Sequence, residues 1–301
     1  MSDVRSASEP PVASIVVPTH ARPARLARLL ESLAGQSVPP ERVEIVIVDD
    51  GSPADARPDG TALPGNARLL RQRQQGPATA RNAGASVAGG AMLAFIDDDC
   101  VAEPGWLEAL LKAHAERPLD LLGGTTLNGL PDNLFSDVAE SLLGFFDADE
   151  RRAGRPLGFV ASNNIACARE AFTRMGGFDT SFPLAAGEDR AFCRSWQTRI
   201  GALSRVPDAR VEHFHAHGPG SFWRQQHNYG RGAALFHAEA TENRRHAFGL
   251  PREPAFYARL LAHYPARRDR TWVRRLGAVP VVALSQLAVG CGLIRERRSR
   301  R

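Results

Sequence analysis

Residues 14–52, SIVVPTHARPARLARLLESLAGQSVPPERVEIVIVDDGS, contain the pattern that decides the fold. The apolar runs at 14–18 and 43–48 have the length of short buried strands. Between them, leucines recur at the spacing of one helix face and a glycine closes the run: Leu26, Leu29, Leu30, Leu33 and Gly35. A strand, a helix and a second strand joined by short connections predict a parallel sheet.

The next segments continue this alternation of strands and helices. Residues 53–66, rich in Pro, Asp, Ala and Gly, are predicted to form a loop, and ARLLRQ at 67–72 a third strand. GPATARNAGASVAGG at 76–90 is predicted to be a helix of small residues that packs closely on a sheet. AMLAFI at 91–96 shows no polar alternation, so we expect a fourth strand that is buried on both faces. The predicted fold class is α/β.

Polar residues follow three of these predicted strands. They are Pro18-Thr19-His20, Asp49-Asp50-Gly51-Ser52 and Asp97-Asp98-Asp99. Ligands of open α/β sheets bind at the carboxyl ends of the strands. The three strand ends therefore predict one polar cleft.

The acids at 97–99 are like charges, which repel one another unless something positive lies among them. Carboxylates two residues apart in an extended chain project to the same side and can chelate one hard cation. Mg²⁺ and Mn²⁺ prefer oxygen ligands and often share them with phosphates. A solvated turn after the strand, near Pro104, explains the acids equally well, so the residues alone leave both interpretations open.

The later part of the chain is predicted to hold further helices and a strand. The helices are expected at 104–118, 136–146 and 187–201, and the strand at 202–218. This strand ends in His213, His215 and His217, which at alternate positions would share one face and suit a metal or a phosphate. A surface histidine cluster is the alternative, above all for His217.

Charge is distributed unevenly along the 301 residues. The net charge is +5, but ten arginines stand against Asp269 and Glu296 from Arg267 onward, so the preceding residues sum to −3. A nucleic-acid-binding protein would carry basic residues across its body, and we therefore expect no nucleic-acid partner. The four cysteines lie far apart without metal-ligand spacing, and residues 1–10 contain no apolar run. Reduced thiols and a cytoplasmic protein are expected.

The predicted organisation is one catalytic domain at 13–235, after a flexible N-terminus at 1–12 and before a helical, arginine-rich extension at 236–301. Within the extension, residues 276–294 contain no charge and are bracketed by arginines. An interfacial helix on anionic headgroups is favoured, because Pro280, polar residues and glycines dilute the segment. A true membrane span and a helix packed on the domain or on a dimer partner are the alternatives.

Four motifs in order resemble the inverting family 2 glycosyltransferases of the GT-A fold, from about residue 14 to residue 232. The motifs are SIVVPTHARPARLARLLESLAGQS, IVIVDDGS, GPATARNAGASVAGGAMLAFIDDDC and NNIACAREAFTRMGGFDTSFPLAAGEDRAFCRSW. The resemblance implies a Rossmann-like, mostly parallel central sheet flanked by helices, with a C-terminal helical tail. His20-Ala21 stands where many members have Tyr-Asn, and Arg190-Ala191-Phe192 replaces a commoner acid-leucine continuation.

The resemblance also implies roles for particular residues. The nucleotide-binding set is Pro18, Thr19, His20, Arg22, Asp50, Arg81 and Asp98. Asp97 and Asp99 would flank a divalent metal, Mn²⁺ or Mg²⁺, with Asp99 the direct ligand. A histidine after the second acidic motif often completes such sites, which favours His213 and places His215 second.

The resemblance makes Asp189 the base that takes the acceptor's proton, with Glu188 supporting acceptor placement. Acids at a helix N-terminus also stabilise the helix without any chemistry, and position alone does not separate the two roles. The implied acceptor side is Asn163, Asn164, Gly177, Phe178 and Asp179. A structural turn is the alternative for the glycines.

The expected activity is metal-assisted transfer of a sugar from a nucleoside-diphosphate sugar to a hydroxyl of a saccharide, lipid-linked or small-molecule acceptor. A sugar nucleotidyltransferase is one alternative, but PTHARPARL lacks the glycines of a triphosphate-binding loop. A nucleotide-sugar-binding module without turnover is another. The expected location is the cytoplasm, at the inner face of the cell membrane if the C-terminal tail binds there.

Overall fold

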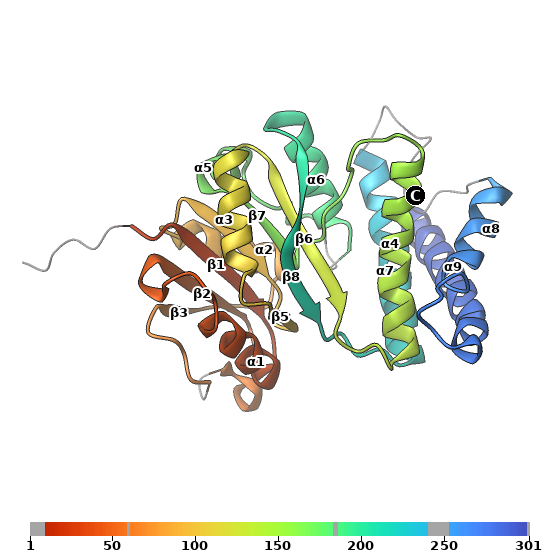
Figure 1. The fold of residues 1–301 in the computed structure, drawn as a ribbon, viewed down its shortest axis with the longest axis horizontal. Coiled ribbons are helices and arrows are strands. Elements are labelled where there is room, and N and C mark those ends of the chain that lie inside the picture. Colours follow the sequence, from red (N-terminus) through yellow and green to blue (C-terminus); the bar gives the residue numbers. More distant parts are fainter. Residues whose placement is uncertain (1–9, 59–60, 183–185, 240–252, 300–301) are drawn as a thin grey trace, which may run out of the picture. The chain divides into compact units, whose positions relative to one another are not determined.

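The computed structural model describes residues 10–58, 61–182, 186–239 and 253–299 (Figure 1). The predicted flexible N-terminus lies outside these residues up to position 9. In the first half of the chain, strands and helices alternate as the apolar pattern predicts. The elements are β1 (Ala13–Thr19), α1 (Pro23–Ala34), a 3₁₀ turn (Pro40–Arg42), β2 (Val43–Asp50), a second 3₁₀ turn (Ala54–Ala56), β3 (Ala67–Gln72), α2 (Pro77–Val87), β4 (Met92–Ile96), β5 (Cys100–Ala102) and α3 (Trp106–Glu116).

The second half begins with strands and ends in helices. Its elements are β6 (Leu121–Asn128), α4 (Leu134–Arg152), β7 (Asn164–Ala168), α5 (Arg169–Met175), α6 (Glu188–Arg199), β8 (Leu203–His213), α7 (Pro219–Glu239), α8 (Pro254–His263) and α9 (Trp272–Ser299). The predicted strand at 202–218 is shorter than expected, because β8 ends at His213. His215 and His217 therefore follow the strand and do not lie on its face.

The strands form one sheet of order β3-β2-β1-β4-β7-β6-β8-β5. The pairs β3–β2, β2–β1 and β1–β4 are parallel, as the strand–helix–strand pattern predicts. The pairs β4–β7 and β7–β6 are antiparallel, so the sheet is mixed beyond β4. The predicted α/β class, with a central sheet, flanking helices and C-terminal helices, is confirmed.

Burial explains why the first elements form where they do. All of β1 and all of β4 are buried, as expected for central strands whose sequences do not alternate. The four leucines that predicted the inner face of α1 are all buried: Leu26, Leu29, Leu30 and Leu33. The small residues of α2 allow close packing, because a Cβ at Gly84 would lie 2.5 Å from a methyl group of Val16.

The chain divides into two compact units. The first contains the residues up to Thr125 together with Ala161–Gly177 and Trp196–Val211, and its core holds the apolar faces of β1, β2 and β4 with α1 and α3. The second contains Thr126–Val160, Phe178–Ser195 and the residues from Glu212 onward. The predicted boundaries of a domain at 13–235 and an extension at 236–301 stay a prediction.

The arginine-rich extension is helical, and α9 is packed against other helices of the second unit. Val281 and Val282 of α9 share an apolar core with Val138 and Phe145 of α4 and with Phe256 of α8. Among the described helices, α9 is long and apolar enough to cross a membrane, with a mean hydropathy of 1.9 in its most apolar window, of which 44% is buried. The structure thus has the packed arrangement that the sequence left as one of three alternatives.

Candidate functional site

The carboxyl ends of β1, β2 and β4 lie on neighbouring parallel strands of the sheet. Thr19 ends β1, Asp50 ends β2, and Asp97 directly follows β4. The predicted polar edge is therefore present in the structure. Its side chains come from three segments that are well separated in sequence.

Each acid of the triplet has a basic partner in this structure. Arg81 of α2 donates to Asp97 at 2.6 Å. Asp98 accepts from the Thr19 hydroxyl at 2.7 Å and from Arg22 at 3.2 Å. The like charges of the triplet are thus offset by arginines from α1 and α2.

Asp99 is held by two arginines from the start of α1. Arg25 donates to its Oδ2 at 3.0 Å and Arg22 at 3.4 Å. Arg25 was not predicted from sequence. The available signal was its position three residues after Arg22, the N-cap of α1, which brings both side chains to the N-terminal end of the helix.

Burial raises the pKa of the central acid of the triplet. Asp98 is 3% exposed, and burial raises the pKa of its carboxyl to about 6, while Arg22 and the Thr19 hydroxyl oppose the rise. The charges of Asp99 and Asp97 add to the rise. Additional positive charge at this edge would therefore stabilise the ionised triplet.

Asp50 is oriented by the loop that follows β3. Its Oδ1 accepts from the backbone N–H of Gln75 at 2.8 Å and from Gln72 Nε2 at 2.7 Å, and its Oδ2 accepts from the N–H of Gly76 at 2.8 Å. The ring of His20 lies beside it, with Nδ1 2.9 Å from the Asp50 carbonyl oxygen. Because a carbonyl only accepts, Nδ1 carries the proton in this arrangement and Nε2 is the acceptor of the neutral ring.

Two other predicted nucleotide contacts lie on β1 and α2. Pro18 is buried in β1 and pairs in register with Val48 of β2. Arg81 is 3% exposed, so only a small part of its guanidinium reaches the surface. The predicted nucleotide residues therefore lie together in the first unit.

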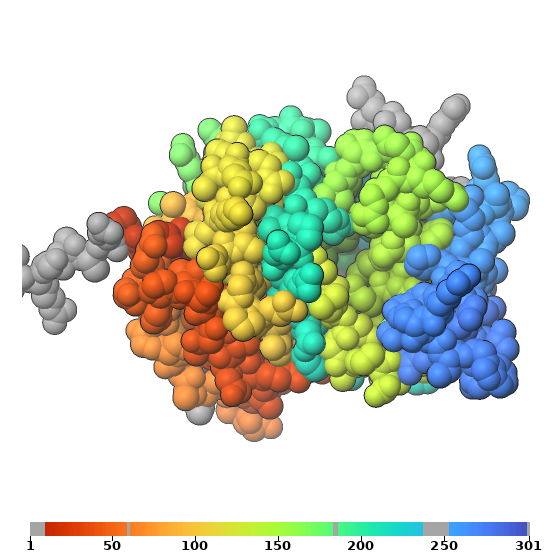
Figure 2. Space-filling model, in the orientation of Figure 1, coloured from red at the N-terminus to blue at the C-terminus, as the bar shows by residue number. Residues whose placement is uncertain are grey.

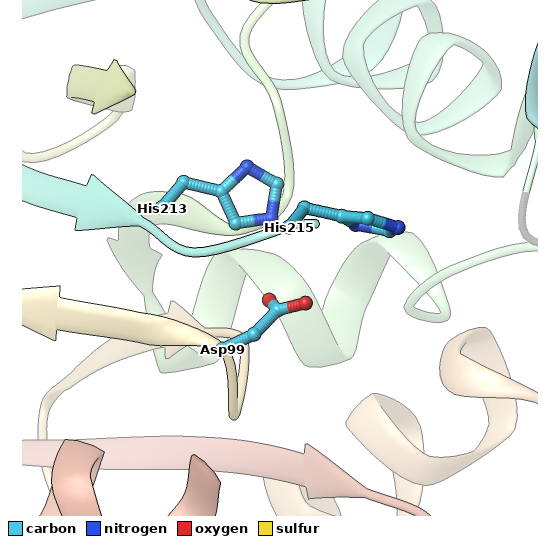
Figure 3. Close-up of side chains that lie close together, drawn as sticks. All are labelled: Asp99, His213 and His215. Carbon is cyan, nitrogen blue, oxygen red and sulfur yellow. The ribbon is translucent and has the colours of Figure 1, made fainter. Parts of the chain in front are cut away.

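A possible metal-binding group consists of Asp99, His213 and His215, whose ligand atoms all lie within 4.8 Å of one another (Figure 3). Asp99, which directly precedes β5, belongs to the first unit, and His213, the last residue of β8, belongs to the second. Asp99 and His213 were predicted as ligands and His215 was the second choice. Asp97 was also predicted beside the metal, but it is not a member of this group and pairs instead with Arg81.

The segment after β8 is held by hydrogen bonds within the second unit. The Ser136 hydroxyl of α4 donates to the His215 carbonyl at 2.8 Å and accepts from the His217 N–H at 3.2 Å. The rings of His215 and His217 stack with centroids 4.3 Å apart. His217 is 5% exposed, so the surface-cluster interpretation is wrong for this residue.

The second acidic motif lies at the N-terminus of α6. Glu188 is the first residue of the helix and is 5% exposed, while Asp189 Oδ1 accepts from the N–H of Arg190 at 2.9 Å. Gly187 precedes them with a φ of 99°, a backbone conformation that glycine adopts without strain. These contacts fit both a stabilised helix start and a positioned carboxylate.

Tyr229 of α7 belongs to the surroundings of this acidic pair and was missed from sequence. Burial raises the pKa of its hydroxyl, and the charges of Asp189 and Glu188 raise it further. The spacing of Tyr229 within WRQQHNYGRG gave no signal of this proximity. The second acidic motif is thus a group of titratable side chains in which Glu188 is buried and Asp189 and Tyr229 are half-buried.

The residues predicted for the acceptor side differ in what their side chains contact. Asn164 is 2% exposed, accepts from Trp106 Nε1 at 2.8 Å, and donates to the carbonyls of Ala209 at 3.0 Å and Thr125 at 3.2 Å. Its amide thus has structural partners within the sheet, and its role as an acceptor contact stays a prediction. Asn163 is only partly buried.

The GGFD segment also has a structural character. Gly177 has a φ of 77°, and a Cβ there would lie 2.5 Å from the side-chain oxygen of Asn82. Phe178 is 2% exposed and stacks on Phe192 with ring centroids 4.1 Å apart. Asp179 is exposed, and its Oδ1 accepts from the Ser181 N–H at 2.8 Å. The turn alternative explains Gly177, and packing explains Phe178.

Comparison with protein families and curated proteins gives consistent matches. The family described as "Glycosyl transferase family 2" matches residues 14–176. Validoxylamine A glucosyltransferase of Streptomyces hygroscopicus subsp. limoneus is 30% identical over 212 residues, which cover 60% of this chain and 47% of that protein. Pre-mycofactocin glycosyltransferase of Mycobacterium tuberculosis is 29% identical over 210 residues, which cover 67% of this chain and 42% of that protein. The chain thus spans about half the length of the curated relatives it matches.

Solved structures show the same fold. A mannosyltransferase of Pyrobaculum calidifontis, solved with GDP-Man and Mn²⁺, has a TM-score of 0.61 and 15% identity, covering 98% of this chain and 89% of that one. GalNAc-T7, solved with UDP, GalNAc and Mn²⁺, has a TM-score of 0.55 and 17% identity, covering 80% and 55%. The predicted GT-A fold is confirmed.

Proposed function

This chain belongs to glycosyl transferase family 2, and we propose that it is an inverting enzyme that moves a sugar from a nucleoside-diphosphate sugar to a hydroxyl acceptor. The observation that carries the proposal is the polar sheet edge of the first unit, where the acid triplet follows β4 and contacts Thr19, Arg22, Arg25 and Arg81. The names of the relatives support it, because each describes a glycosyltransferase.

We assign the nucleoside of the donor to the first unit. Pro18, Thr19 and His20 at the end of β1 lie next to Asp50, whose carboxylate is fixed by backbone N–H groups. A fixed carboxylate and a neutral imidazole can read the donors and acceptors on the edge of a nucleobase. Asp98 would contact the ribose, while the guanidinium groups of Arg81 and Arg22 would face the diphosphate. The proposed nucleotide-binding residues are thus Pro18, Thr19, His20, Arg22, Asp50, Arg81 and Asp98.

We assign the metal to Asp99, His213 and His215. One carboxylate oxygen and two imidazole nitrogens suit Mn²⁺ better than Mg²⁺, which prefers oxygen ligands alone. A bound ion would neutralise the diphosphate and stabilise the nucleotide leaving group. In this proposal Asp97 acts on Arg81 and holds its guanidinium in place.

We assign the general base to Asp189. Direct displacement needs one group to take the acceptor's proton as its oxygen attacks the anomeric carbon. The carboxylate lies at the start of α6, where the N–H of Arg190 donates to one of its oxygens and orients the group. Glu188 and the exposed Asp179 are proposed to place the acceptor.

The proposed location is the cytoplasm, where nucleotide sugars are made, at the inner face of the cell membrane. The exposed apolar face of α9 is proposed to make the membrane contact. The acceptor is proposed to be a saccharide, a lipid-linked sugar or a small hydroxylated molecule.

Asp189→Asn tests the proposed chemistry, with Glu170→Gln as the control because Glu170 is an exposed acid at the start of another helix. Turnover of Asp189→Asn should fall by about 10²–10⁴-fold while donor binding persists. The control variant Glu170→Gln should keep both turnover and donor binding. Turnover that survives in Asp189→Asn would remove this residue as the base.

A thermal-shift panel identifies the donor nucleotide. Uridine, thymidine and guanosine diphosphates are compared with and without Mn²⁺, since a ligand of the native state raises the melting temperature. Release of a nucleoside diphosphate supports sugar transfer. Consumption of a nucleoside triphosphate with release of pyrophosphate would instead show a nucleotidyltransferase, and binding without any product would show a binding module.

A further inference from the structure

Helix α9 is fixed to the second unit by one of its faces. A Cβ at Gly292 would lie 1.9 Å from the His227 carbonyl oxygen of α7, and a Cβ at Gly230 would lie 2.0 Å from the Val289 carbonyl oxygen. The two helices thus meet at backbone contact through these glycines. Arg231 of α7 also forms an ion pair with Glu296 at 2.8 Å.

The opposite face of α9 is exposed and apolar. It consists of Trp272, Leu276, Pro280, Ala283, Leu287, Cys291 and Ile294, which we call the α9 stripe. Its large side chains are well exposed: Trp272 by 71%, Leu276 by 62%, Leu287 by 64% and Ile294 by 52%. Figure 2 shows the C-terminal helices, in blue, at the surface.

The stripe is straight. Its members are three or four residues apart, which averages close to the ~3.6 residues of one helical turn. The exposed apolar side chains therefore lie along one line parallel to the helix axis, over a length of roughly 33 Å. A straight apolar line on the outside of a helix fits a flat apolar layer.

Arginines flank both ends of the stripe. Arg268 is exposed before its start, and Arg295, Arg297 and Arg298 are exposed at its end. Glu296, the acid between these last arginines, is 6% exposed and already paired with Arg231. Asp269, the exposed acid next to Arg268, is paired with Arg267 and Arg270, so the net charge beside the stripe is positive at each end.

A membrane span does not fit this helix. Spanning would expose the face that packs on α7 to lipid and would break the ion pair of Glu296 with Arg231. Charged groups in the hydrocarbon core are costly unless they are paired. The helix instead has the two-sided character of one that lies in the plane of an interface.

A second copy of the chain fits poorly for an electrostatic reason. Two stripes packed against each other, parallel or antiparallel, would bring arginine-bearing ends together. A layer that is apolar inside and negative at its surface matches both the stripe and its ends. Anionic lipid has this chemistry.

We propose that the α9 stripe docks the protein flat on an anionic lipid surface, with its apolar side chains at the boundary of headgroups and acyl chains. Trp272 lies at the end of the stripe, where an aromatic ring suits the membrane–water interface. Arg268, Arg297 and Arg298 contact the lipid phosphates. This inference stands independently of the proposed glycosyl transfer.

The test is sedimentation of the full chain with vesicles of phosphatidylcholine, with and without phosphatidylglycerol. The wild-type protein should bind the anionic vesicles and not the zwitterionic ones. Leu276→Glu combined with Leu287→Glu should lower binding at least about tenfold, because two apolar side chains leave the interface. Leu63→Glu combined with Leu119→Glu, which changes two exposed leucines outside α9 by the same charge, should bind like the wild type.

Two further measurements keep the test decisive if the stripe variant misfolds. Arg297→Gln with Arg298→Gln should weaken binding and reduce its dependence on salt. Trp272 fluorescence in the wild-type protein, assigned by loss of signal in Trp272→Phe, should shift to the blue on addition of anionic vesicles and be quenched by brominated acyl chains.

Three outcomes would overturn the proposal. One is a wild-type protein that stays in the supernatant with both vesicle types. The second is a folded stripe variant that binds as well as the wild type. The third is a dimer, measured by analytical ultracentrifugation, that the stripe substitutions dissociate while vesicle binding is absent.

Discussion

Two clusters of aspartate and arginine in this chain contain similar residues but shift the pKa of an aspartate in opposite directions. In the first unit, three carboxylates at 97–99 share three arginines, and burial raises the pKa of Asp98 to about 6. In the second unit, Asp137 is surrounded by basic and hydroxyl donors. These are Arg270 at 2.8 Å, Arg267 at 3.5 Å, Arg274 at 3.6 Å and the Tyr264 hydroxyl at 2.5 Å.

The ratio of carboxylates to positive groups differs between the two clusters. Asp137 is 1% exposed, and although burial pushes its pKa upward, hydrogen bonds from Arg270 and Tyr264 hold the pKa below its ordinary value. That carboxylate is fully compensated and joins α4 to the segment before α9. The triplet is crowded with carboxylates, so an added cation would stabilise it. We propose that the first cluster is arranged for a ligand and the second for the fold.

The largest expected effect is on turnover. Asp99→Asn should lower turnover by about 10³-fold or more, since it removes a proposed metal ligand. Asp137→Asn serves as the matched substitution in the structural cluster and should leave turnover per folded molecule unchanged. Equal losses of specific activity in the two variants would erase the distinction between the clusters.

The second expected effect is on the free energy of unfolding, which Asp137→Asn should lower more than Asp99→Asn. Asp137→Asn should lower the free energy of unfolding by about 2–4 kcal/mol, because it leaves partly buried arginines without their carboxylate. Asp99→Asn in the metal-free protein should change it less, as one of three crowded charges is removed. Urea denaturation in the presence of a chelator measures both, and a larger loss in Asp99→Asn would contradict the account.

Much of the first cluster follows from sequence, because the buried run at 92–96 and the acids after it are local signals. The sheet order in this region depends on the short strand β5. That strand has only three residues and no periodic pattern, so the sequence did not predict it. β6 was also missed, since its LLGGTTLN sequence contains two glycines that weaken any strand signal.

The second cluster could not be predicted. Asp137 and Arg270 are 133 residues apart, and nothing in either local sequence indicates the partner. The same holds for Arg231 and Glu296, and for the close approach of Gly230 and Gly292. Such contacts depend on how helices cross, which the apolar spacing of each helix alone does not determine.

A third prediction concerns pH, where the two clusters should respond in opposite directions. The pKa of Asp98 is raised, so its contribution to stability is full below about pH 4 and is lost as the pH rises through about 6. The pKa of Asp137 is lowered, so its contribution is present above about pH 4 and is lost as the pH falls through the folded-state value.

Metal-free unfolding curves of the wild type, Asp98→Asn and Asp137→Asn between about pH 3 and pH 7 separate these contributions. The advantage of the wild type over Asp137→Asn should shrink toward acid. The free energy of unfolding of the wild type relative to that of Asp98→Asn should fall toward neutral pH. Parallel curves for all three proteins would refute the assignment.

The smallest expected effect sharpens the role of Arg25. Its guanidinium lies 3.0 Å from Asp99 Oδ2 and competes with a cation for that oxygen. Arg25→Gln should therefore tighten Mn²⁺ binding in the absence of nucleotide by about two- to fivefold, since the pair is partly exposed. Arg28→Gln, one helical turn further along α1, is the control. Weaker Mn²⁺ binding in Arg25→Gln would show that the arginine supports the site and does not compete for it.

The central claim is that Asp99 at the sheet edge of the first unit holds a divalent cation that would join the donor's diphosphate to that edge. Calorimetric titration of Mn²⁺ into the wild type and Asp99→Asn, each with and without the nucleoside diphosphate found by thermal shift, tests it directly. The account predicts Mn²⁺ binding that the nucleotide strengthens in the wild type and that Asp99→Asn abolishes. Nucleotide binding that is identical with and without Mn²⁺, in both proteins, would contradict it.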